Sequence, residues 1–164
     1  MTLNLSADEV LTTTRSVRKR LDFDKPVPRE VLTECLDIAL QAPTGSNNQG
    51  WQWVFVEDPA KKKAIADIYR TNATPYLNQP KPTLGDMRDE QRPRVEDSAR
   101  YLNDHLHEVP VMLIPCLEGK PQDAVSGASA GFWGSLLPAA WSFMLALRSR
   151  GLGSAWTTLH LLGD

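Results

Sequence analysis

The chain has 164 residues, of which 41% are hydrophobic and 23% are charged, and its formal net charge is −2. This length and composition predict one soluble globular domain that buries a sizeable core without disulfide bonds. A nucleic-acid-binding protein would need a basic excess, and the wide separation of Cys35 from Cys116 excludes zinc-ribbon and thioredoxin-type motifs. The N-terminus shows no signal-peptide pattern, so we expect a cytoplasmic protein.

The N-terminal half begins with a helix that a capping box should open, because Ser6 stands three residues before Glu9. A basic cluster and two prolines separate this helix from the next one. After a polar loop, alternating apolar residues predict a strand, and Pro59 suits the first turn of a third helix. In chain order we expect a helix over residues 6–14, a helix over 29–41, a loop over 42–50, a strand over 51–57 and a helix over 60–72.

The C-terminal half opens with a proline-rich segment that we expect to be irregular, since long loops of this kind often bind ligands. Helical and strand periodicities then alternate, and Gly151 is expected to end the longest helix. In chain order we expect an irregular segment over residues 73–93, a helix over 94–106, a buried strand over 109–117, a long buried helix over 123–150 and a final strand over 153–162.

Residues 124–147 carry no charged side chain. The run is long enough for a transmembrane helix, which needs about 20 apolar residues. Serine, glycine and proline make its first half only weakly apolar, which favours a helix buried on nearly all sides instead. Either the core of this chain or a second chain would cover such a helix.

Three groups of residues carry chemical information. In the first, Arg15-Ser16-Val17-Arg18, two guanidinium groups and a hydroxyl can converge on one phosphate; the alternative is a solvated basic turn. The second is the loop over residues 42–51, whose neutral donors and acceptors suit the edge of a heterocycle. The third, Gly153 to Thr158, combines small residues with Trp156 and two hydroxyls and can line a planar ligand. An ordinary turn and an ordinary strand are the alternatives for these two.

Other chemical signals are weak. His105, His107 and His160 lack metal-ligand spacing, and no serine or cysteine lies in a recognisable nucleophile motif. We therefore expect no metal site, and no nucleophile stands out.

Taken together and in this order, the motifs resemble the nitroreductase family of FMN flavoproteins. The resemblance rests on residues 14–18, 26–32 and 42–56, on the long helix and on residues 151–158. It implies an α+β fold with three α/β/α layers, a central and mostly antiparallel sheet flanked by helices, and a long helix buried at a homodimer interface. It also implies that residues 1–164 form a single FMN-binding domain that lacks the family's usual C-terminal extension.

The resemblance assigns roles by position. Three residues would hold the phosphate and ribityl end of FMN, namely Arg15, Ser16 and Arg18. Six would line the flavin ring and its pyrimidine edge: Pro43, Thr44, Gly45, Ser46, Asn47 and Gln49. Three would approach the flavin from the third group, namely Trp156, Thr157 and Thr158. Two would reach the flavin of the partner chain, namely Leu137 and Pro138.

The family implies an FMN-dependent oxidoreductase that oxidises NAD(P)H and reduces nitroaromatics, quinones or related conjugated electrophiles. Hydride would pass through flavin N5 in a ping-pong reaction, so the cofactor rather than a side chain carries the chemistry. The partners would be a small-molecule electron acceptor and a second copy of the chain, with neither nucleic acid nor membrane. Two alternatives stay open: a flavin-fragmenting or dehalogenating enzyme of the same superfamily, and a non-catalytic flavin-binding or sequestering protein. The chain departs from the family at Thr14, where arginine is common, and at Gly50, where proline is usual.

Overall fold

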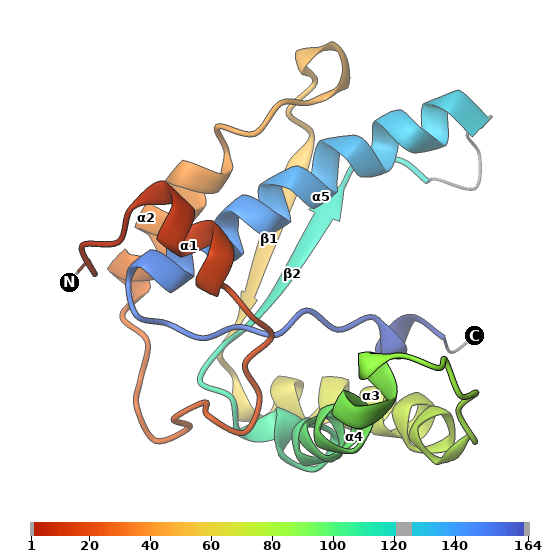
Figure 1. Ribbon diagram of the computed structural model, residues 1–164. Coiled ribbons are helices and arrows are strands. Elements are labelled where there is room, and N and C mark those ends of the chain that lie inside the picture. The colour runs from red at the N-terminus through yellow and green to blue at the C-terminus, as the bar shows by residue number, and fades with distance from the viewer. Residues whose placement is uncertain (1, 121–125, 163–164) are drawn as a thin grey trace.

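The computed structural model describes the backbone of residues 2–120 and 126–162, and the side chains of the same residues except 126–128. Helices and one antiparallel pair of strands give the α+β class that the sequence predicts (Figure 1). The helices are α1 (Ala7–Thr13), α2 (Arg29–Ala39), α3 (Pro59–Asn78), α4 (Met87–His105) and α5 (Ser126–Ser149), with short 3-10 turns η1 (Gly45–Asn47), η2 (Leu106–Glu108) and η4 (Leu159–Leu161). The strands are β1 (Trp51–Val56) and β2 (Met112–Leu117).

Several local signals are confirmed at the ends of the helices. The Ser6 hydroxyl accepts a hydrogen bond from the Glu9 amide at 3.2 Å, and the Ser6 amide donates to the Glu9 carboxylate at 2.7 Å, which completes the capping box before α1. Gly151, with a φ of 77°, ends α5, and the Leu152 amide donates back to the Leu147 carbonyl at 3.0 Å. Glycine adopts this left-handed conformation without the cost that a Cβ brings.

The two strands pair in one antiparallel register, from Trp51 opposite Leu117 to Val56 opposite Met112. The more buried side chains of β1 pack against α5, where the rings of Trp53 and Phe55 lie 6.4 and 6.2 Å from that of Phe143. A half-buried strand of this kind is what the alternating pattern predicts.

The main core lies between α2 and α5. Leu32, Cys35 and Ala39 from α2 pack with Phe143 and Leu147 from α5, and all are buried. Burial raises the pKa of the Cys35 thiol, so this cysteine is expected to be unreactive. The packing holds α5 across the strands in Figure 1.

A second core joins α3 and α4, below the strands in Figure 1. Tyr69 and Ala73 of α3 pack there with Leu102 of α4. Ala155 and Leu159 reach the same cluster after α5 has ended. The C-terminal segment therefore crosses the molecule from the end of α5 to the α3–α4 pair.

Two expectations for the C-terminal half are wrong. Residues 73–93 are not irregular, because α3 runs to Asn78 and α4 begins at Met87, with a proline inside each helix. Burial of Ala73 and Leu77 against α4 outweighs the local preference of proline to end a helix. Residues 153–162 form no strand: they meet the rest of the backbone in a single parallel bridge and end in η4.

The long helix is confirmed in its described part, which begins at Ser126, while residues 123–125 lie outside the description. It is not buried on nearly all sides, because Trp133, Leu137 and Trp141 are exposed. Residues Ser129–Ser149 are long and apolar enough to cross a membrane, with a hydropathy of 1.3, but the core helix of a soluble protein passes the same test. The packing of α5 against α2 and the strands makes it a core helix of this fold.

Gly153 marks a point where two segments approach closely. A Cβ at this position would lie 3.0 Å from both the Val17 Cβ and the Leu21 Cδ2. Gly153→Ala is therefore expected to lower the free energy of unfolding by about 1–3 kcal/mol, the usual cost of overpacking. Gly50→Ala is the control, because its Cβ would meet ordinary contacts of 3.5 Å or more. Equal effects of the two substitutions in denaturant unfolding would contradict this account.

Candidate functional site

The first and third groups of residues meet in the structure. Ser16 and Ser154 form a parallel bridge, in which the Val17 amide donates a hydrogen bond to the Ser154 carbonyl at 2.8 Å. Gly153 lies against Val17 and has no side chain to hold the two segments apart. Segments from opposite ends of the sequence therefore lie side by side, as a shared binding site requires.

The two arginines of the first group do not share one cavity. Arg15 lines a pocket beside α1, whereas Nη1 of Arg18 donates to the Ser98 hydroxyl on α4 at 3.4 Å. Burial raises the pKa of the nearby Tyr69, and the positive charge of Arg18 acts against that rise. One phosphate held by both arginines would need Arg18 to turn away from α4.

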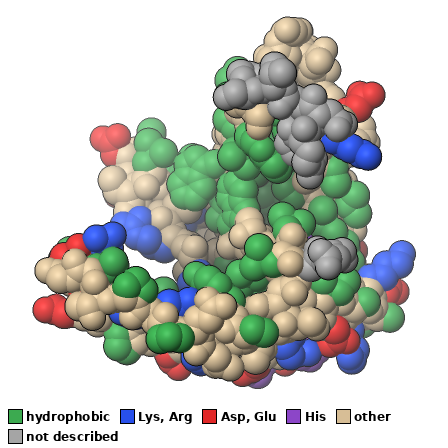
Figure 2. All heavy atoms as spheres, turned by 90° about the vertical axis from the view of Figure 1, so that its right-hand side faces the viewer, with side chains coloured by type: hydrophobic (Ala, Val, Ile, Leu, Met, Phe, Trp, Pro, Cys, Tyr) green, Lys and Arg blue, Asp and Glu red, His purple; other side chains and the backbone are tan. Residues whose placement is uncertain are grey.

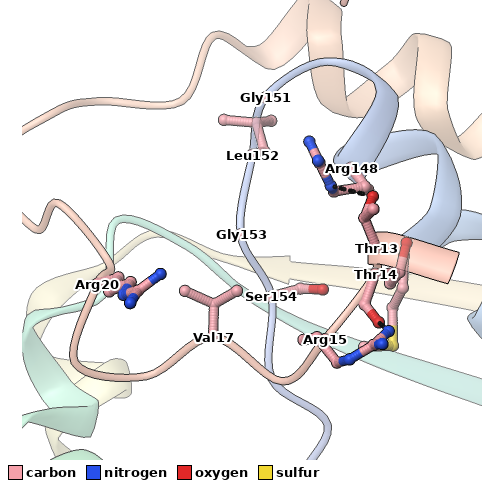
Figure 3. Close-up of a pocket in the computed structure, with 11 residues that line it drawn as sticks. Thr13, Thr14, Arg15, Val17, Arg20, Arg148, Gly151, Leu152, Gly153 and Ser154 are labelled. Carbon is pink, nitrogen blue, oxygen red and sulfur yellow. Dashed lines mark hydrogen bonds between the residues drawn. The ribbon is translucent and has the colours of Figure 1, made fainter. Parts of the chain in front are cut away.

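The pocket has a volume of about 230 Å³ and lies where α1, the bridge and the end of α5 meet (Figure 3). Its lining contains three arginines and, within the described part of the chain, no carboxylate. The lining residues are Thr13, Thr14, Arg15, Val17, Arg20, Met144, Arg148, Gly151, Leu152, Gly153 and Ser154.

Hydrogen bonds to α1 hold two of these arginines in place. Nη1 of Arg15 donates to the Thr14 carbonyl at 2.7 Å, and Nε of Arg148 donates to the Thr13 hydroxyl at 3.2 Å. Figure 3 shows Arg148 and Arg15 on either side of Thr13 and Thr14, with Arg20 across the Gly153–Ser154 backbone from them. The Thr14 hydroxyl is itself used within α1, where it donates to the Val10 carbonyl at 2.7 Å.

The second group lies elsewhere. The Gly45 amide donates to the Ser135 hydroxyl at 2.9 Å, and Nε1 of Trp51 donates to the Ser135 carbonyl at 2.7 Å, so the loop is fastened to the N-terminal half of α5. Ser135 and Arg148 are thirteen residues apart on this helix, or about 20 Å along its axis. Figure 1 shows the loop at the top of the molecule, well away from the bridge. One copy of the chain therefore does not bring all three groups together.

The loop has a strained backbone. Ser46, Asn47 and Gln49 have φ values of 54°, 55° and 48°, a left-handed conformation that costs about 1–2 kcal/mol for each residue with a Cβ. The Gln49 amide donates to the Thr44 hydroxyl at 3.3 Å, and the Gln49 side chain donates to that of Asn47 at 2.8 Å. Strain of this kind clusters at binding sites, where the surrounding structure maintains it. Thr44 is half-buried, and the other expected site residues of the loop are exposed, namely Pro43, Gly45, Ser46, Asn47 and Gln49.

The other expected site residues lie near the surface. Trp156 and Thr158 are exposed and Thr157 is half-buried, just beyond the bridge. On α5, Leu137 is exposed and Pro138 is half-buried. Trp133, Leu137 and Trp141 recur every four residues and are 41%, 38% and 41% exposed, so they form an apolar stripe along one face of the helix. Figure 2 shows hydrophobic side chains gathered on a hollowed face above α3 and α4.

Sequence reasoning missed Ser135, Arg20 and Arg148. Arg148 ends the uncharged run, and that position was a usable signal. A single serine in an apolar helix offered none. No group of three metal-ligating side chains lies together in the part of the chain that the structure describes.

Comparison with known proteins identifies the class to which this fold and site belong. The model of the nitroreductase family matches residues 11–162. The chain therefore belongs to the nitroreductase family.

Individual relatives differ in what they do. An NADH dehydrogenase from Thermus thermophilus is 32% identical over 111 residues, which are 67% of this chain and 46% of that protein. An iodotyrosine deiodinase from Thermotoga neapolitana is 28% identical over 140 residues, 85% of this chain and 67% of that protein. A solved structure of an FMN and NADPH-dependent nitroreductase variant from Sphigopyxis sp. strain HMH is 30% identical, with a TM-score of 0.56 over 92% of this chain and 73% of that one. The chain thus spans less than half of the Thermus relative.

The Ser135 hydroxyl holds the loop to α5, so it is expected to matter for stability. Ser135→Ala would remove the acceptor of the Gly45 amide, and because Gly45 is exposed we expect the loss of one ordinary hydrogen bond, about 0.5–1.5 kcal/mol. Denaturant unfolding measures the loss. Ser142→Ala is the matched control on the same helix, since the described residues give the Ser142 hydroxyl no hydrogen bond and a change of less than about 0.5 kcal/mol is expected. An equal loss in both variants would contradict the anchoring role.

Proposed function

We propose that this protein is an FMN-dependent NAD(P)H oxidoreductase that reduces nitroaromatics, quinones or related conjugated electrophiles. The observation that carries the proposal is the contact between the Arg15–Arg18 segment and the Gly153–Thr158 segment at a cationic pocket. Membership of the nitroreductase family supports it, as does the similarity to an FMN and NADPH-dependent nitroreductase.

The residues at this contact fit FMN. Arg15 offers a guanidinium to a phosphate in a pocket whose described lining holds no carboxylate. Gly153 allows close approach of a ribityl chain, and Trp156 presents an exposed aromatic face beyond the bridge. Ser16 does not line the pocket itself, but it is exposed at the bridge, where its hydroxyl could donate to the ribityl chain.

When bound, FMN supplies the hydride chemistry, accepting two electrons from NAD(P)H and passing them to the acceptor. The role of the chain is to bind the cofactor and to orient it. The backbone amides and the hydroxyls of Thr157 and Thr158 would provide donors for the ring, and such donors would stabilise negative charge on it. No side chain at the site needs to exchange a proton for this role.

The separation of the loop from the cationic pocket along α5 is the reason to infer a homodimer. The loop that would line the pyrimidine edge is anchored at Ser135, about 20 Å along α5 from Arg148 of the cationic pocket, so a second copy has to supply it. Antiparallel packing of the two α5 helices along the Trp133–Leu137–Trp141 stripe would turn the loop of one copy toward the pocket of the other. Leu137 and Pro138 would then approach the flavin of the partner. Exposure of the stripe supports this pairing, because an exposed apolar patch of this kind is typical of an interface.

A cytoplasmic location is part of the proposal. Both cysteines are free, as expected for a reducing compartment where NAD(P)H is abundant. Reductive dehalogenation is a second candidate reaction, and its support is the similarity to an iodotyrosine deiodinase.

The activity is tested on the purified full chain with added FMN. We expect a flavin absorption spectrum after gel filtration, bleaching of that spectrum by NADPH or NADH, and rapid steady-state turnover with a nitroaromatic or a quinone. Turnover with 3-iodotyrosine alone would identify the dehalogenating alternative. Tight FMN binding without turnover would identify a flavin-binding protein, and absence of FMN binding would overturn the proposal.

Trp141→Glu tests the proposed pairing. A buried charge in the stripe is expected to convert the dimer to a monomer in analytical ultracentrifugation, and to weaken FMN binding because the partner's loop is lost. Ile68→Glu is the matched control, since Ile68 is an exposed apolar residue on α3 outside the stripe. A dimer that persists in Trp141→Glu, or dissociation in both variants, would argue against this interface. Circular dichroism confirms that both variants fold.

A further inference from the structure

Arg148 and Arg150 lie two residues apart at the end of α5 but are held differently. Arg150 donates to the Ala146 carbonyl at 3.2 Å and to the Ser149 hydroxyl at 3.0 Å, and it pairs with Glu34 at 3.4 Å. Arg148 donates only through Nε, to Thr13 at 3.2 Å. Its two Nη groups have no acceptor among the described residues. The guanidinium of Arg148 is therefore fixed at one end and available at the other.

The other two arginines of the pocket also have N–H donors without an acceptor among the described residues. Arg15 donates from one Nη to a carbonyl, and Arg20 has no hydrogen bond to a described residue. Elsewhere in the described chain, most arginines that pair do so with carboxylates: Arg29 with Glu57, Arg70 with Asp67, Arg88 with Asp86 and Arg92 with Asp89. Three positive charges gathered without a counter-charge repel one another, and an anion in the pocket would remove that repulsion.

The kind of anion follows from charge and geometry. A phosphate monoester carries a charge of about −1.5 to −2 at neutral pH and three strong acceptor oxygens. Guanidinium groups bind such oxygens through paired N–H donors. The pocket also offers the Ser154 hydroxyl and the backbone of Gly153, which has no side chain in the way. A single carboxylate would leave most of this positive charge uncompensated.

We propose that Arg148, together with Arg15, binds a phosphate monoester in this pocket. The inference rests on the proposed function, because the tail of FMN is the phosphate monoester expected here. The 2′-phosphate of NADPH has the same chemistry and is the other possible source. Arg148 thereby gives α5 a direct part in cofactor binding at its C-terminal end, where a helix also favours positive charge.

The main experiment compares the full chain with Arg148→Gln, Arg148→Lys and Arg94→Gln, by titration with FMN and with riboflavin. Arg148→Gln is expected to weaken FMN binding at least tenfold and to leave riboflavin binding within about twofold, since only FMN carries the phosphate. The FMN affinity of Arg148→Lys is expected to lie between those of the unmodified chain and Arg148→Gln, because lysine keeps the charge and loses the paired donors. Arg94 is exposed on α4 and outside the pocket, so Arg94→Gln controls for net charge.

Two further measurements separate the sources of phosphate. A higher KM for NADPH, with KM for NADH and FMN affinity unchanged, would support Arg148 as a phosphate ligand for the dinucleotide instead. Unchanged FMN affinity together with unchanged KM for NADPH overturns the proposal. An equal loss of FMN and riboflavin binding also overturns it, because Arg148 would then act only through the fold.

Inorganic phosphate tests Arg148 independently of the proposed function. Phosphate is expected to raise Tm of the unmodified chain at an ionic strength matched with chloride, and Arg148→Gln should abolish that rise. If the chain binds neither FMN nor riboflavin, the proposed function fails, while this Tm shift still decides the role of Arg148. No phosphate-dependent shift in the unmodified chain would overturn the role.

Discussion

The packing of α5 against α2 and β1 is the interaction on which the rest of the structure depends. Ala139, Phe143 and Leu147 are buried along this contact, and Ser135 and Arg148 extend from the same helix toward its two ends. A helix this firmly packed acts as a rigid spacer, because its length is fixed at about 1.5 Å for each residue. The positions of the loop and of the cationic pocket are therefore set by one element, and neither can approach the other within a single copy.

The site itself is built from backbone contacts more than from reactive side chains. The bridge between Ser16 and Ser154 joins two segments that have no other extended backbone pairing in the described chain. Around it stand arginines, hydroxyls and glycine, which bind and orient but do not readily exchange protons at neutral pH. Such a site suits a protein whose chemistry comes from a bound group.

Much of this could be predicted from the sequence, and the failures have physical causes. The capping box at Ser6, the strand beginning at Trp51 and the stop at Gly151 are local signals, and each is confirmed. Pro75 led to the wrong prediction of an irregular segment, because the preference of proline to end a helix is local. The burial of Ala73 and Leu77, which maintains the helix, comes from packing against α4. The convergence of Arg15 and Arg18 on one phosphate stays a prediction, and the spacing gave no sign that α4 provides a separate partner for Arg18. Ser135 and Arg148 were missed because their partners, Gly45 and Thr13, are distant in sequence.

The separation of the loop from the pocket has a thermodynamic consequence under the proposed pairing. If each copy holds half of a cradle, the cofactor binds the associated form far better than the isolated one. Ligand uptake and self-association are then linked by mass action, and each must strengthen the other by the same factor. Saturation with flavin would depend on protein concentration as well as on the supply of flavin, so dilution alone would release the cofactor.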